Sequence, residues 1–324
     1  MIKNPFLYTN DNKRYHTFDY EMKRLFEGKV VKIPLDAGMT CPNLDGTKGW
    51  GGCTYCGNRG AGDFVGTGET LTEQFEDGKK RILSKWPSSQ YIVYFQAHSN
   101  TYAPVSRLRT LFEAALRLPK VVGICIATRA DLLPPEVIAL LGEFDQRTFL
   151  TVELGLQTVH DRTAERINRC HSYTEFLTGY RALQENGIRT VVHLINSLPG
   201  ETKEMMLETA QKTAALLPWG IKLHMLHILK GTKLAEEYEQ GPFELLELQE
   251  YASLVCEQLE LFSPKTVVER VTGDGPKGQV IAPLWTFRKR EVLAAIDKEF
   301  VRRESFQGIH CVLEDEQLEL PEIL

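Results

Sequence analysis

Three cysteines near the amino terminus are the residues of this 324-residue chain whose types and spacing most clearly indicate chemistry. Cys41, Cys53 and Cys56 form a Cys-x11-Cys-x2-Cys pattern, and Tyr55 stands directly before the last cysteine. Closely grouped thiols in a chain without a recognisable secretion signal favour a metal or iron–sulfur site over disulfides. Three thiolates also leave one coordination position for a ligand that is not protein.

Two other interpretations of these cysteines stay open: half of a zinc ribbon, or three ordinary buried cysteines. A ribbon needs a second pair of ligands, and clustering within sixteen positions argues against chance. The remaining cysteines stand singly, and we expect them to be small buried hydrophobic residues: Cys125, Cys170, Cys256 and Cys311. The pattern therefore favours iron–sulfur over zinc.

The elements around the cysteines predict a strand, a loop and then a helix. Residues 30–36 are a short apolar run typical of a strand. The loop that follows contains Pro42 and several glycines, which permit tight turns and a close approach of the backbone to an inorganic core. A helical pattern over 71–86 comes next.

Strand-like and helix-like segments continue to alternate along the chain. The predicted strands are 30–36, 91–97, 121–128, 148–156, 189–198 and 221–229. The predicted helices between them are 71–86, 106–118, 135–144, 160–168, 173–186 and 201–217, and 245–262 and 289–303 follow. Six repeated units favour an α/β fold with a partial, open barrel over a doubly wound sheet, a choice that pattern alone does not force.

Composition is that of a soluble globular protein, with 43% hydrophobic and 25% charged residues. No apolar stretch is long enough to span a bilayer, and residues 1–5 lack the order of a signal peptide, so we expect a cytoplasmic protein that does not enter a membrane. The net charge is −5, yet basic residues crowd the carboxyl-terminal third. Such charges fit a solvated helix face, which sequence alone slightly favours, or a phosphate-binding surface.

The cysteines and the strand ahead of them resemble the radical S-adenosylmethionine (SAM) superfamily, in which three thiolates hold a 4Fe-4S cluster and SAM chelates the fourth iron. The first spacing is longer than the usual Cys-x3-Cys-x2-Cys. It resembles a minor branch that includes the radical SAM subunit of Elongator and its bacterial relatives, with coproporphyrinogen-dehydrogenase-like enzymes nearby. The resemblance implies a partial (β/α)6 TIM-like barrel with N-terminal and C-terminal extensions.

Polar residues at the ends of the predicted strands carry the rest of the resemblance. Residues 94–101 stand where the family contacts the amino group of SAM, 153–157 are similar to Glu-x-Gly-x-Gln, and 167–171 are similar to a segment whose arginine reaches the SAM carboxylate. The residues that the resemblance implies for SAM are Tyr55, Gln96, Ser99, Asn100, Thr101, Glu153, Gln157 and Arg169. An ordinary capped turn at 96–101 and a Glu-to-Lys pair inside the barrel are the structural alternatives.

We therefore expect an N-terminal extension over 1–29, the radical SAM partial barrel over 30–240, and a C-terminal extension over 241–324 that contacts substrate. The resemblance implies reductive cleavage of SAM to a 5'-deoxyadenosyl radical, with an electron donor such as flavodoxin or ferredoxin. The favoured substrate is the tRNA wobble uridine, whose 5-carboxymethylaminomethyl group would become 5-aminomethyl. A small metabolite or tetrapyrrole substrate, and a non-catalytic Fe-S electron-transfer protein, are the alternatives.

Overall fold

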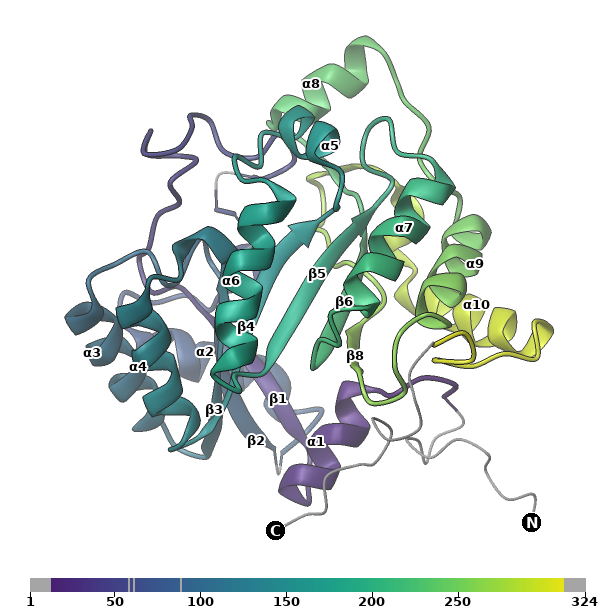
Figure 1. Cartoon of the computed structure of the whole chain (residues 1–324). Coiled ribbons are helices and arrows are strands. Elements are labelled where there is room, and N and C mark those ends of the chain that lie inside the picture. Colours follow the sequence, from purple (N-terminus) through teal and green to yellow (C-terminus); the bar gives the residue numbers. More distant parts are fainter. Residues whose placement is uncertain (1–12, 58, 61, 88, 312–324) are drawn as a thin grey trace, which may run out of the picture.

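A curled sheet of parallel strands with helices on its outer face forms the body of the protein (Figure 1). The computed structural model describes residues 13–311 apart from 58, 61 and 88. Within them the sheet has seven strands in the order β1-β2-β3-β4-β5-β6-β8. These are β1 (Val30–Leu35), β2 (Gln90–Phe95), β3 (Val121–Thr128), β4 (Phe149–Gln157), β5 (Thr190–Asn196), β6 (Gly220–Met225) and β8 (Val267–Arg270). The predicted partial barrel is confirmed.

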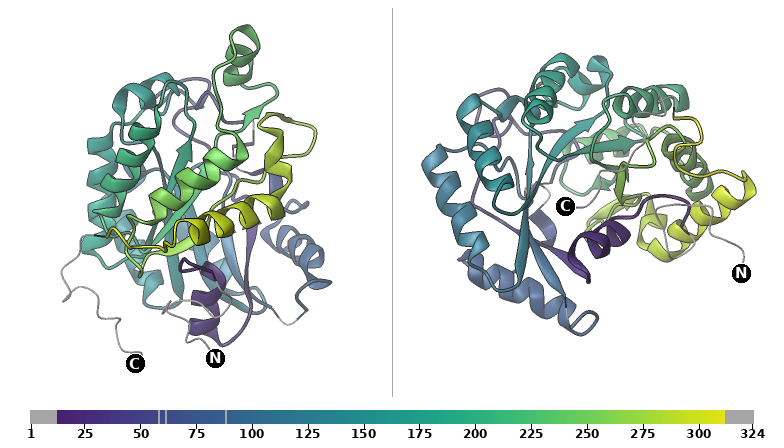
Figure 2. Two further views of the ribbon diagram at one scale, coloured as in Figure 1. Left: turned by 90° about the vertical axis from the view of Figure 1, so that its right-hand side faces the viewer. Right: turned by 60° about the horizontal axis from the view of Figure 1, so that its bottom comes forward.

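The helices lie mainly outside the curl, as both views in Figure 2 show. They are α1 (Phe18–Phe26), α2 (Leu71–Leu83), α3 (Val105–Leu116), α4 (Pro135–Asp145), α5 (Asp161–Arg166), α6 (Tyr173–Glu185), α7 (Lys203–Ala214), α8 (Lys233–Gln240), α9 (Leu248–Leu259) and α10 (Lys289–Arg302). Reciprocal side-chain caps begin two of them: Thr70 with Glu73 for α2, and Ser172 with Glu175 for α6. These Ser/Thr-x-x-Glu patterns explain why the sequence marks both helix starts well.

The sheet is one strand wider than the sequence predicts. The sequence predicts no strand between the helices 245–262 and 289–303, but β8 lies there and pairs in parallel with β6, with Val268 opposite Ile221. A two-stranded antiparallel sheet of β7 (Ile228–Leu229) and β9 (Val280–Ala282) lies beyond it. The parallel sheet therefore continues past residue 240 into the predicted C-terminal extension.

Three apolar clusters are buried in the described residues, and one of them packs Ile167, Leu198 and Leu226 near the carboxyl ends of the strands. The largest one lies between the outer face of the strands and the helices, where buried side chains such as Val93, Val152 and Leu223 pack. Another lies inside, where Met22 of α1 packs with Val30 and Ile92. Helix α1 contacts both β1 and β8, so it covers the amino-terminal end of the sheet. Residues 1–12 of the predicted N-terminal extension lie outside the described part of the chain.

A buried network of charges links the two edges of the sheet across the interior. The ammonium group of Lys32 on β1 lies 2.7 Å from a Glu153 carboxylate oxygen and 2.6 Å from one of Glu269 on β8. Lys222 on β6 lies 2.6 Å from the other Glu153 oxygen and 3.4 Å from Glu269. Four strands that are not all neighbours are thus joined by two lysines and two carboxylates.

We predict that Glu153→Gln lowers the free energy of unfolding by about 3–5 kcal/mol, because it leaves two buried ammonium groups with one carboxylate. Urea denaturation of the protein without cofactors measures this. Glu143→Gln is the control, because its ion pairs with Arg109 and Arg147 are exposed and their loss should cost much less than the loss of Glu153. Equal losses in the two variants would contradict the prediction.

The difference in unfolding free energy between wild type and Glu153→Gln should depend on pH in a definite direction. Burial alone would raise the pKa of Glu153, but Lys222 and Lys32 outweigh it and hold this pKa well below the ordinary value of 4.5. A carboxyl whose pKa is lowered by folding stabilises the protein above its unfolded value and loses that contribution as pH falls through the folded value. The gap between wild type and Glu153→Gln should therefore be constant near neutrality and shrink only below about pH 4.5.

Candidate active site

Cys41, Cys53 and Cys56 line one cavity of about 330 Å³ at the carboxyl ends of the strands. None of the three is in a disulfide; Cys41 and Cys53 are half-buried and Cys56 is exposed. A backbone turn sets the last pair, with the Cys56 amide donating to the Cys53 carbonyl over 2.9 Å. The three thiols that were predicted from spacing alone therefore face a common space.

Asparagine side chains fasten the cysteine loop to the segment after α5. The Asn43 amide donates to the Asn168 carbonyl over 2.6 Å and lies 3.7 Å from the Cys53 sulfur. Asn168 donates in turn to the carbonyl of Gly52 over 2.7 Å. A side chain at Gly49 would meet the Cys170 sulfur at 2.7 Å, so a glycine is needed for this close approach.

Arg129, which sequence reasoning missed, supports the cysteine end of the cavity from the end of β3. Its guanidinium donates to the carbonyls of Arg169 and Cys170 over 2.8 and 3.2 Å and pairs with Asp131. The pKa of the Cys53 thiol is lowered to about 7, first by a hydrogen bond with Cys56 and further by the charge of Arg129. The same hydrogen bond raises the pKa of Cys56 well above its ordinary value, so Cys53 is the member of this pair that is held as thiolate, the form that binds metals.

Arg169 is almost fully buried and one of its nitrogen atoms lacks a hydrogen-bond partner. Its Nε donates to the His171 carbonyl over 3.0 Å, and Nη1 donates to the carbonyls of Leu156 and Thr158. Nη2 has no hydrogen bond, and the nearest carboxylate oxygen, of Asp161, is 3.7 Å away. Because an unsatisfied buried donor is costly, this nitrogen suits a ligand group in the cavity.

The end of β4 places Glu153 and Gln157 on the same cavity. Glu153 is already fully engaged, since Tyr94, His193 and Cys125 contact its carboxylate besides the two lysines. The structural alternative raised by the sequence, a Glu-to-Lys pair inside the barrel, is therefore present. Gln157 folds back over Gly155, where a Cβ atom would meet the end of the Gln157 amide at 2.4 Å.

The polar residues that follow β2 lie partly on the cavity and partly away from it. Gln96 and Ser99 line the cavity. Asn100 instead donates to the carbonyls of Phe95, Ala97 and Ala127 over 3.0–3.1 Å. Its side-chain nitrogen therefore braces the ends of β2 and β3, as the capped-turn alternative implies, and Asn100 does not line the cavity.

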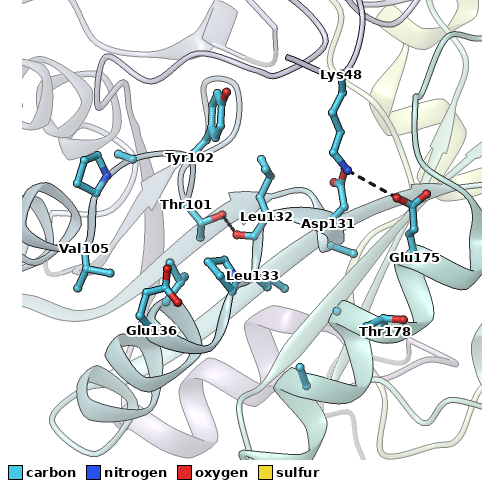
Figure 3. Close-up of a pocket in the computed structure, with 17 residues that line it drawn as sticks. Lys48, Thr101, Tyr102, Val105, Asp131, Leu132, Leu133, Glu136, Glu175 and Thr178 are labelled. Atoms are coloured by element: carbon cyan, nitrogen blue, oxygen red, sulfur yellow. Dashed lines mark hydrogen bonds and ion pairs between the residues drawn. The ribbon is translucent and has the colours of Figure 1, made fainter.

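Thr101 lies on a separate outer groove of about 830 Å³ that holds none of the cysteines. Its hydroxyl donates to the Leu132 carbonyl over 2.8 Å and contacts Thr128 over 2.6 Å. Figure 3 shows this groove, with Lys48 reaching toward Asp131 and Glu175. Thr101 thus faces away from the cavity that we expected it to line.

Sequence reasoning also missed a set of ionisable residues on the far wall of the cavity: His193, Lys222, His224 and Arg270. The available signal was a charged or imidazole side chain inside an apolar strand, as in Val192-His193-Leu194 and Ile221-Lys222-Leu223. Such residues rarely stand on a buried strand unless they face a partner or a polar space.

Two absences complete the geometry. Among the residues that the structure describes, no three His, Cys, Asp or Glu side chains stand close enough to hold a single metal ion. A cluster makes a different demand, because each thiolate binds its own iron atom. In the same part of the chain no helix has the length and apolar character needed to cross a membrane.

Comparison with known proteins decides the family. A model of the radical SAM superfamily matches residues 47–213, and a model of a radical SAM C-terminal domain matches 218–302. The chain belongs to the radical SAM superfamily. The first match begins after Cys41, so it includes Cys53 and Cys56 together with β2 to β5.

The relatives of this radical SAM chain include Elongator proteins. The uncharacterized protein YtqA of Bacillus subtilis is 50% identical over 95% of this chain and 96% of its own length. Human Elongator complex protein 3 is 27% identical over 63% of this chain and 39% of its own length. The structure of Methanocaldococcus infernus Elp3 has the same fold, with a TM-score of 0.62 at 15% identity, over 86% of this chain and 64% of that one.

Membership of this superfamily implies a 4Fe-4S cluster and SAM, and the residues present fit both groups. The donor set is right for a cluster, with three thiols outside disulfides on one cavity. The unsatisfied Nη2 of Arg169 on the same cavity suits the carboxylate of SAM. Tyr55, Gln96, Ser99 and Gln157 line the remaining wall and can orient a ligand.

We predict that Cys53→Ala abolishes both cluster binding and SAM cleavage, because two thiolates cannot hold the cluster. Iron and acid-labile sulfide content after anaerobic reconstitution, together with 5'-deoxyadenosine formed with dithionite, measure the two effects. Cys311→Ala is the control, since Cys311 does not line the cavity. Wild-type cleavage by Cys53→Ala would rule out the assignment.

Proposed function

We propose that Cys41, Cys53 and Cys56 bind a 4Fe-4S cluster and that the enzyme converts the 5-carboxymethylaminomethyl group of a tRNA wobble uridine into 5-aminomethyl. The observation that carries the tRNA proposal is a basic surface next to the site. The cavity of about 330 Å³ continues into a second one of about 200 Å³ that opens beside residues 273–276. Spaces of this size take a cofactor and one small group, so a nucleic acid would enter by inserting a single nucleotide.

The surface beside this opening is basic. Lys277 and Arg290 are exposed there, and Arg288 and Lys289 form exposed pairs with Glu291 and Asp274. Exposed pairs of this kind are weak, so their cations can exchange a carboxylate for a phosphate. The resemblance to the Elongator branch and this basic surface together favour tRNA over a small metabolite or tetrapyrrole.

The proposed conversion is an oxidation that the cofactors can balance. When bound, they supply a 5'-deoxyadenosyl radical that takes one hydrogen atom from the substrate. Loss of one further electron and addition of water then break the bond between nitrogen and the carboxymethyl carbon. The products are the 5-aminomethyl group, glyoxylate, methionine and 5'-deoxyadenosine. The electron that the substrate radical loses balances the one that SAM cleavage consumes. The protein's part is to hold the substrate carbon in place and restrict water.

We predict that the anaerobically reconstituted protein forms 5-aminomethyluridine and glyoxylate in equal amounts when given SAM, dithionite and tRNA carrying the 5-carboxymethylaminomethyl group. Nucleoside chromatography and derivatised glyoxylate measure the products. The control is tRNA that already carries 5-aminomethyl. SAM cleavage that no tRNA stimulates would favour a small-molecule substrate, and a filled cluster without any SAM cleavage would favour electron transfer.

Neutralising three basic residues tests the tRNA surface. We predict that Arg288→Gln/Lys289→Gln/Arg290→Gln weakens tRNA binding roughly tenfold and lowers the slope of log affinity against log salt concentration by about 2, because each phosphate contact contributes about 0.7–0.9 to that slope. Binding titrations at several salt concentrations measure both quantities.

Arg109→Gln/Arg147→Gln serves as the control, because these exposed arginines lie on α3 and just before β4, away from the opening. Binding by wild type that does not depend on salt, or an equal loss in both variants, would contradict a role for the C-terminal surface.

A further inference from the structure

Eight of the described residues line both cavities, and two of them are ionisable side chains from strands β6 and β8. His224 on β6 and Arg270 at the end of β8 line the cavity of the cysteines and also the smaller cavity beyond it. Asp274 and His227 line the smaller cavity alone. Cys56 and Gln96 also line both cavities, so a group held by His224 and Arg270 lies in the same space as one of the thiols.

Strand register brings these side chains together. Lys222 on β6 is the register partner of His193 on β5 and of Arg270 on β8. His224 is two residues further along β6, so it faces the same side of the sheet as Lys222. Its ring stacks on His193, with ring centroids 5.7 Å apart and 17° between the planes. The arrangement is fixed by three neighbouring strands instead of a loop.

His224 and Arg270 can still form hydrogen bonds to a ligand, whereas their neighbours Lys222 and His193 already contact Glu153. Lys222 and His193 both contact the same Glu153 oxygen, at 2.6 and 2.9 Å. The Nε2 atom of His224 is buried and has no partner. Within the described residues, Asp274 is the acid in ion-pair distance of Arg270, at 3.5 Å from Nη1. Because a buried polar group without a partner is costly, a ligand that pairs with His224 Nε2 gains affinity, and the partly exposed Arg270 can bind the same ligand in place of Asp274.

The charge at this junction favours an anion. Glu153 and Glu269 are matched by Lys32 and Lys222, whereas Asp274 is shared by two cations, Arg270 at 3.5 Å and Lys289 at 3.1 Å. Burial, and next the charge of Arg270, lower the pKa of His224 well below its ordinary value. A bound carboxylate would relieve both effects, because it offsets the positive charge and accepts hydrogen bonds.

We propose that Arg270 and His224 form a carboxylate-binding subsite that recognises the acidic end of the substrate's carboxymethylamino group. This inference rests on the proposed function. An arginine fork can hold both carboxylate oxygens, and the imidazole can hold one of them from the side. The carbon next to that carboxylate is the one that must lose hydrogen, so the subsite positions it. The tRNA product carries 5-aminomethyl and has no carboxylate. It therefore loses these contacts, which aids its release.

The test compares affinities of one tRNA in two forms. Wild-type holoenzyme should bind tRNA with 5-carboxymethylaminomethyluridine about tenfold or more tightly than the same tRNA with 5-aminomethyluridine, because a site with unpaired polar groups rejects a ligand that lacks the matching group. In Arg270→Gln the preference should fall below about threefold, and Arg270→Lys should retain part of it. His224→Phe, which keeps a ring beside His193 but removes Nε2, should lose part as well.

Two readouts separate this subsite from general damage and from the proposed function. All variants, and the control Arg147→Gln, should bind the full amount of iron and sulfide, because the ion pair of Arg270 is with Asp274 and not with a cysteine; loss of the cluster in Arg270→Gln would give it a structural role and overturn the subsite. Full preference retained by Arg270→Gln would overturn the subsite but leave the proposed function standing. Wild type that binds both tRNAs equally and converts neither would refute both.

Discussion

Four buried charges hold the barrel in its curled shape. Lys32 and Glu269 stand on the two edge strands, and Glu153 and Lys222 connect them through the interior. Removing such charges from water costs several kcal/mol for each ion, and that cost is offset only when all partners meet with good geometry. A flatter or differently registered sheet would separate them. The network therefore contributes to the choice of one curvature, and hence of one cavity, more than to net stability.

Much of the fold could be predicted because strand and helix signals are local. Apolar runs mark six parallel strands, and capping pairs such as Thr70 with Glu73 mark helix starts. Strand β8 was missed because its four residues, Val267–Arg270, include only two apolar side chains and resemble a loop. Its stability comes from pairing with β6 and from Glu269, neither of which a periodic pattern reveals.

Site residues could be predicted where their spacing in the sequence determines their position. They could not be predicted where the orientation of the side chain decides whether it faces the cavity. Three cysteines close in sequence reach one cavity almost unavoidably. Asn100 and Thr101 also stand at a strand end, yet their side chains bind backbone carbonyls or face an outer groove, a choice made by tertiary packing. The basic wall opposite the thiols depends on register among β5, β6 and β8, so it emerges only when the strands are placed.

The position of the charge network bears on where this chain could be divided. The segment that matches the superfamily model, residues 47–213, contains Glu153 but none of its charged lysine partners and not Glu269. A fragment excised at those bounds would bury a carboxylate without a counterion and would lack three strands, β1, β6 and β8. The matched segment is therefore related by descent to other proteins but is not a unit that folds on its own. Glu153, which lies inside it, also constrains mutations in the flanking strands.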